Sequence, residues 1–88
     1  MAESYDVAVK VISQKGNCGA EHKVGDEWII RRKTPEGICL SALMAIYPSL
    51  RVLRFGGVMP WQTEPDVTQV ICPDIENPVI FELRRLRE

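Results

Sequence analysis

The sequence predicts an α+β fold in which one kinked or broken helix packs on a small antiparallel sheet. Two observations indicate the elements: alternating apolar residues recur near both ends of the chain, and one central segment has apolar residues at helical spacing. A third is that clusters of glycine, proline and asparagine separate these segments. The expected element order is ββαββ, and residues 1–88 are expected to form a single domain with a modest core.

The first two strands are predicted at residues 5–13 and 27–32. In the first, Tyr5 begins a series of alternate β-branched or aromatic residues, so its face is the better core face. In the second, Trp28 and Ile30 fall on one face. The connection between these strands is long for a hairpin, and long loops in compact domains often carry functional residues.

The helix is predicted to begin at Thr34-Pro35, because threonine can cap a helix and proline suits its first position. Pro48 should kink this helix, or end it near Ile46 and start a second short one. Gly56-Gly57 should end it, because glycine suits a left-handed cap. The stripe expected to face the core is Cys39, Ala42, Leu43, Ile46, Leu50 and Leu53.

Two more strands are predicted at residues 67–72 and 79–83. The six residues between them, 73–78, contain two prolines, an aspartate and an asparagine. These residue types favour turns, so the two strands are expected to form a hairpin.

Composition limits the classes of partner. Eleven Lys and Arg against twelve Asp and Glu leave a formal charge of −1, so we expect no nucleic-acid partner and no membrane partner. The arginine clusters at 31–32, 51/54 and 84–87 are expected on solvated faces. The N-terminus has no signal-peptide pattern, which predicts a cytoplasmic protein with reduced thiols.

Cysteine and histidine form one candidate site, with Cys18, His22, Cys39 and Cys72 as metal ligands. Thiolate and imidazole are preferred zinc ligands, and the expected metal is zinc or iron. The spacing lacks the close cysteine pairs typical of closed zinc sites, so convergence of all four side chains is a hypothesis.

Two other interpretations of the cysteines remain open. Free cysteine behaves as a small apolar residue, so these thiols can be packing residues. Alternatively, Cys39 lies near a predicted helix N-terminus, where a thiol is activated, and His22 could serve as its base. Cys18 is the other candidate nucleophile.

A non-enzymatic binding or accessory protein is the alternative to the metal or thiol site. So short a chain has little core in which to enclose a pocket, which favours a homo-oligomer. In this interpretation Trp61, Arg51 and Arg54 contact a partner or a small anionic ligand.

Motifs along nearly the whole chain carry a resemblance to a known group. They are Gly16-x-Cys18, His22-Lys23-Val24-Gly25-Asp26, Thr34-Pro35-Glu36-Gly37-Ile38-Cys39, Arg54-Phe55-Gly56-Gly57, Pro60-Trp61, Cys72-Pro73-Asp74 and Asn77-Pro78-Val79. With these motifs the chain resembles a family of small uncharacterised prokaryotic proteins of about this length, with three cysteines and a His-Lys-Val-Gly-Asp motif. The resemblance implies that the cysteines and the histidine recur in the family. It implies no activity.

Overall fold

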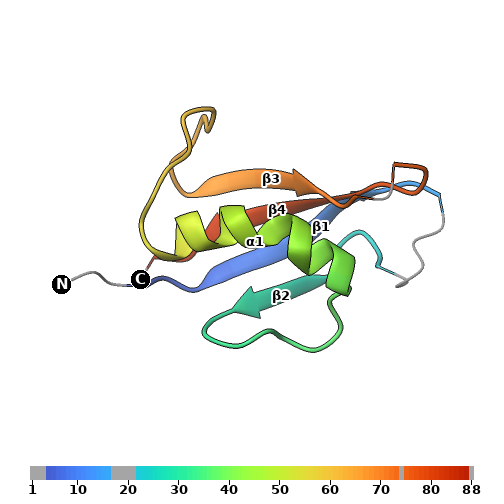
Figure 1. The fold of residues 1–88 in the computed structure, drawn as a ribbon, viewed down its shortest axis with the longest axis horizontal. Coiled ribbons are helices and arrows are strands. Elements are labelled where there is room, and N and C mark those ends of the chain that lie inside the picture. The colour runs from blue at the N-terminus through green and yellow to red at the C-terminus, as the bar shows by residue number, and fades with distance from the viewer. Residues whose placement is uncertain (1–3, 17–21, 74, 88) are drawn as a thin grey trace.

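The structure is a computed structural model that describes residues 4–16, 22–73 and 75–87. One helix packs on one face of a four-stranded antiparallel sheet of order β2-β1-β4-β3 (Figure 1). The elements are β1 (Val7–Gln14), β2 (Glu27–Ile30), α1 (Leu40–Arg54), β3 (Val67–Ile71) and β4 (Val79–Arg85). The predicted α+β class and the order ββαββ are confirmed.

The core lies between α1 and the face of the sheet that it covers. Val7, Val9 and Val11 of β1 are fully buried there, so the predicted core face of the first strand is confirmed. The core also contains residues of β2, α1 and β4: Ile30, Ala42, Ile46, Leu50, Leu53, Val79, Phe81 and Leu83. The helical stripe predicted from the sequence therefore faces the sheet.

The helix begins at Leu40 and not at Thr34-Pro35, so the predicted start is wrong. A turn precedes it, in which Gly37 has a φ of 88°, a left-handed conformation that a right-handed helix does not contain. The indole Nε1 of Trp28 donates to the carbonyl oxygen of Glu36 at 3.0 Å. Tertiary contact therefore holds this segment outside the helix, although its residues suit a helix start.

Pro48 lies inside α1, and the helix continues through it as one element. Of the two outcomes expected from the sequence, the break near Ile46 does not occur. Proline has no N–H to donate to the carbonyl four residues earlier. Because Pro48 is on the exposed side of the helix, water can satisfy that carbonyl.

The two glycines after α1 end it as predicted. Gly56 has a φ of 83°, and its N–H donates to the carbonyl oxygen of Leu53 at 3.2 Å. The N–H of Gly57 donates to the carbonyl oxygen of Val52 at 2.8 Å. This pair of hydrogen bonds is the Schellman motif, which satisfies carbonyls at the end of a helix.

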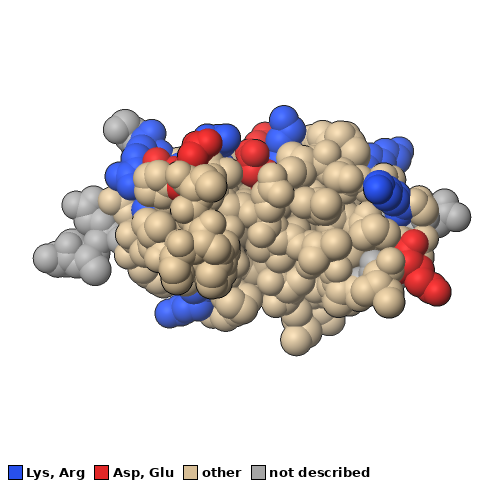
Figure 2. Space-filling view, turned by 90° about the horizontal axis from the view of Figure 1, so that it is seen from above, with Lys and Arg blue, Asp and Glu red and all other residues tan. Residues whose placement is uncertain are grey.

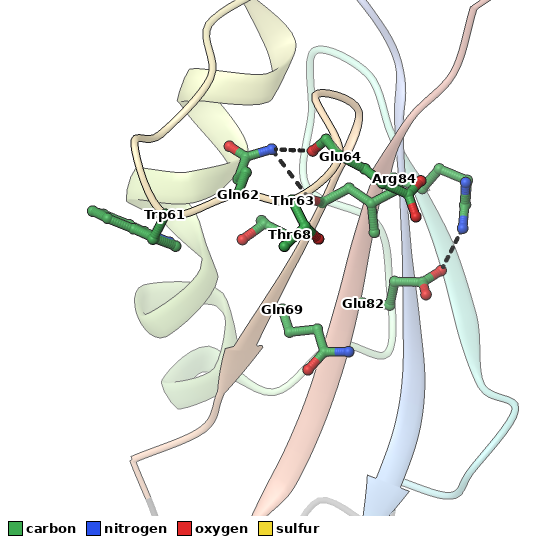
Figure 3. A pocket seen from close by; sticks show the side chains of 9 residues that line it. Trp61, Gln62, Thr63, Glu64, Thr68, Gln69, Glu82 and Arg84 are labelled. Carbon is green, nitrogen blue, oxygen red and sulfur yellow. Dashed lines mark hydrogen bonds and ion pairs between the residues drawn. The ribbon is translucent and has the colours of Figure 1, made fainter.

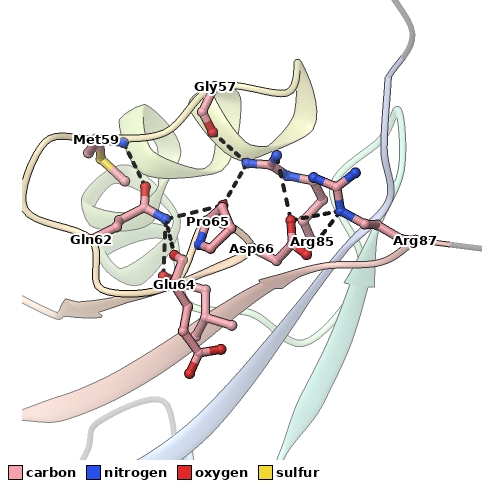
Figure 4. A network of polar contacts seen from close by, with 9 residues as sticks. Gly57, Met59, Gln62, Glu64, Pro65, Asp66, Arg85 and Arg87 are labelled. Atoms are coloured by element: carbon pink, nitrogen blue, oxygen red, sulfur yellow. Dashed lines mark hydrogen bonds and ion pairs between the residues drawn. The ribbon is translucent and has the colours of Figure 1, made fainter.

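The arginines at 84–87 were expected on a solvated face, and for Arg85, at the end of β4, this expectation is wrong. Arg85 is only 3% exposed. Its Nη2 donates to the carbonyl oxygens of Gly57 and Pro65, and Nη1 lies 3.7 Å from a carboxylate oxygen of Asp66 (Figure 4). Arg87 pairs with the same carboxylate at 2.9 Å. The guanidinium of Arg85 thus joins the connection between α1 and β3 to the last strand.

No helical segment among the described residues has both the length and the apolar character needed to cross a bilayer.

Candidate functional site

The three described members of the predicted ligand set, His22, Cys39 and Cys72, belong to one end of the fold. The β1–β2 connection, the first turn of α1 and the β3–β4 hairpin all lie at this end (Figure 1). His22 is in the β1–β2 connection, Cys39 occupies the N-cap position of α1, and Cys72 begins the β3–β4 hairpin. Cys18 lies outside the described residues.

His22 is 4% exposed and packs between aromatic rings. Its ring centroid is 5.2 Å from that of Trp28 and 5.8 Å from that of Phe81, both edge-on. Its Nε2 lies 3.3 Å from the N–H of Cys39 and 3.3 Å from the carbonyl oxygen of Gly37. The tautomer decides which of these two hydrogen bonds forms. Either one holds the backbone just before α1, so His22 helps to set the start of the helix.

The two described cysteines are half-buried free thiols that pack against the core. The contact between His22 and Cys39 is made by the backbone N–H of Cys39 and not by its thiol. Cys72 Sγ accepts a hydrogen bond from the N–H of Val79 at 3.3 Å. Among the described residues, no three His, Cys, Asp or Glu side chains are grouped so that they could hold a metal ion. The four-ligand site, which includes Cys18, stays a prediction.

The metal hypothesis has a direct test. If the thiols only pack, Cys39→Ala should lower the free energy of unfolding by about 1 kcal/mol through the space it leaves, and a chelator should not change the melting temperature. If a metal is bound, the chelator should lower the melting temperature of the wild type but not of Cys39→Ala, because the metal stabilises only the folded state. Thermal unfolding of both proteins with and without chelator separates these outcomes.

A groove of about 210 Å³ lies between the end of β2, the segment that follows it and α1. We call it the basic groove, because half of its lining residues are cationic. Its lining is Ile30, Arg31, Arg32, Lys33, Thr34, Leu43, Tyr47, Leu50, Arg51 and Arg54. β2 ends at Ile30, earlier than predicted, so the cationic residues that follow belong to a loop.

Most of the positive charge in the basic groove has no carboxylate partner within residues 4–16, 22–73 and 75–87. Arg31 pairs with Asp6, with Nε 3.2 Å from the carboxylate. The other four cations, Arg32, Lys33, Arg51 and Arg54, form no ion pair with any described carboxylate. Like charges gathered in this way raise the local potential and attract anions.

The two helical arginines are held by aromatic rings. The guanidinium carbon of Arg51 lies 5.1 Å from the ring centroid of Phe55, and that of Arg54 lies 5.3 Å from it. Arg51 Nη1 also donates to the hydroxyl of Tyr47 at 3.3 Å. A cation over an aromatic face keeps its charge while part of its conformational freedom is removed. The side chains of these two arginines are therefore partly oriented by the protein itself.

Trp61 lines a different cleft, of about 440 Å³, beside β3 and β4 (Figure 3). Its side chain points away from Gln69 and Glu82. Other polar groups there already have partners: Gln62 Nε2 donates to the carbonyl oxygen of Glu64 at 2.9 Å, and Glu82 pairs with Arg84 at 3.5 Å. The three predicted contact residues thus lie on two surfaces, with Arg51 and Arg54 together and Trp61 apart.

Charge is unevenly distributed over the molecule. The face seen from above has a broad area without Lys, Arg, Asp or Glu, and its charged side chains lie mainly toward the rim (Figure 2). β3, at this edge of the sheet, consists of neutral residues only. The cationic cluster of the basic groove is therefore a local feature, on a chain whose net charge is close to zero.

The described residues define a small α+β fold with an open cationic groove beside α1. Comparisons with models of protein families, with curated proteins and with solved structures found no match to this chain. The resemblance described from the sequence motifs stays a prediction.

Proposed function

We propose that this protein is a non-enzymatic binding or accessory protein that holds a small anionic ligand in the basic groove. The observation that carries the proposal is the set of four cationic side chains around one groove, none paired with a described carboxylate. An anion would relieve the repulsion among them. Three of these four cations, Arg32, Arg51 and Arg54, are arginines. The planar donors of an arginine match carboxylate and phosphate oxygens.

The lining of the groove supports binding more than catalysis. The described residues around it include no cysteine, histidine, aspartate or glutamate, the side chains that most often act as nucleophile, acid or base. In this proposal Cys39 and Cys72 are packing residues. Association into a homo-oligomer stays a prediction.

Arg51→Gln and Arg54→Gln should each weaken binding of the ligand at least tenfold, because each removes charge-assisted hydrogen bonds of about 1.5–3 kcal/mol. Pyrophosphate and citrate are suitable probes, with affinity measured by calorimetry at low ionic strength. The matched control is Arg84→Gln, which removes the same charge from an arginine outside the groove that pairs with Glu82.

The proposal fails if neither probe binds to the wild-type protein. It also fails if Arg84→Gln weakens binding as much as Arg51→Gln, because the probes would then be responding to total charge and not to the groove.

A further inference from the structure

We propose that the ligand of the basic groove is an amphipathic anion, a carboxylate or phosphate that carries an aliphatic chain. This inference rests on the proposed function and adds the chemical class of the ligand. It is carried by two features that a purely ionic ligand would not use: an apolar floor in the groove, and an exposed apolar stripe that continues from it along α1.

The floor of the groove is apolar. Ile30 and Leu50 are buried, Leu43 is half-buried, and the ring of Tyr47 is half exposed beside them. A compact ion such as phosphate would bind the cations at the rim and leave the exposed parts of Leu43 and Tyr47 against water. A ligand with a hydrocarbon part would cover them, and removing apolar surface from water favours binding.

The apolar stripe consists of Leu40, Met44 and Tyr47, on the side of α1 away from the sheet. Leu40 is 73% exposed and Met44 is 72% exposed. Residues four and seven positions apart share one face of a helix, so the three side chains form a continuous row. Leu43 and Tyr47 are also four apart, which connects the groove floor to this row. Contiguous exposed apolar surface of this kind marks binding sites.

Arg51 fixes the direction in which such a ligand would lie. Its guanidinium donates to the hydroxyl of Tyr47, where the groove and the apolar stripe meet. The anionic group would therefore lie among the cations of the groove, with the chain running past Tyr47 toward Met44 and Leu40. The groove volume of about 210 Å³ equals that of roughly seven water molecules, so it holds a head group and only the start of a chain.

The test measures affinity for acetate, butanoate, hexanoate and octanoate by calorimetry, each below its micelle concentration. We expect affinity to rise about two- to fourfold for each added methylene, because each one buries further apolar surface. From butanoate to octanoate the increase should be at least tenfold.

Met44→Ser should lower the affinity for octanoate at least threefold and leave citrate binding unchanged, because Met44 contacts only the chain. Arg51→Gln should weaken both ligands. The matched control is Ile71→Ser, which changes an exposed apolar side chain on β3, outside the groove, and should have no effect. Because Met44 and Ile71 are highly exposed, we expect both variants to stay folded, and circular dichroism checks this.

The outcomes separate this inference from the proposed function. If citrate binds but affinity does not rise with chain length, the inference is wrong and the proposed function stands. If no anion binds, both fail. Equal losses for Ile71→Ser and Met44→Ser would overturn the inference, because octanoate would then be binding non-specifically. Binding to phosphatidylglycerol vesicles without binding of dissolved octanoate would also overturn it, in favour of a membrane surface.

Discussion

Arg85→Ala should lower the free energy of unfolding by about 3–5 kcal/mol, the largest effect we expect from a single polar residue. The buried guanidinium donates to the carbonyl oxygens of Gly57 and Pro65, and both would lose a charged donor. Asp66 would keep Arg87 as a partner, so the cost comes mainly from the two carbonyls. Urea unfolding followed by circular dichroism measures this change.

The neighbouring arginine is the control. The side chain of Arg84 is 50% exposed and pairs with Glu82 at the surface, so Arg84→Ala should change the free energy of unfolding by less than about 1 kcal/mol. Similar small effects for both substitutions would contradict the structural role assigned to Arg85.

Ile46→Ala should lower the free energy of unfolding by about 2–4 kcal/mol. Ile46 is fully buried at the centre of α1, and truncating it removes apolar contacts and leaves a cavity. Leu43→Ala should have a smaller effect, because Leu43 is half-buried at the edge of the core. Met44→Ala should stay within about 0.5 kcal/mol, because Met44 faces solvent.

Denaturant unfolding of the three helix variants tests the orientation of α1. The expected order of destabilisation is Ile46, then Leu43, then Met44. If Met44→Ala were as costly as Ile46→Ala, the side of the helix assigned to the core would be wrong, and the apolar stripe could not be an exposed binding surface.

The sequence alone was sufficient to predict the four strands, the helical stripe and the end of the helix. Each is indicated by a pattern of residues close together in the chain. The alternation through Val7, Val9 and Val11 reports a strand with one buried face, and the left-handed cap at Gly56 requires only local geometry. The α+β class followed from these elements and their order.

The local helix preference of the residues was not sufficient to predict where α1 begins. Thr34-Pro35 suits a helix start, but contacts from Trp28 and His22 hold the next residues in a turn before Leu40. These contacts join residues eight or more positions apart, so no local pattern reports them. The metal hypothesis illustrates the same limit: the sequence identified candidate ligands, but whether side chains converge is a property of the folded chain.

Of all the features described, the position of the candidate site depended most on the tertiary structure. The sequence identified Arg51 and Arg54 as candidate contacts for an anion, and it showed Arg31-Arg32 as a separate cluster. Packing of α1 on the sheet brings the two clusters to one groove, and it places Arg85, from a third cluster, inside the protein. The residue types were enough to indicate positive charge. Only the fold decided which charges are buried with partners and which gather at the surface without a described carboxylate partner, because burial and pairing depend on distances between segments far apart in the chain.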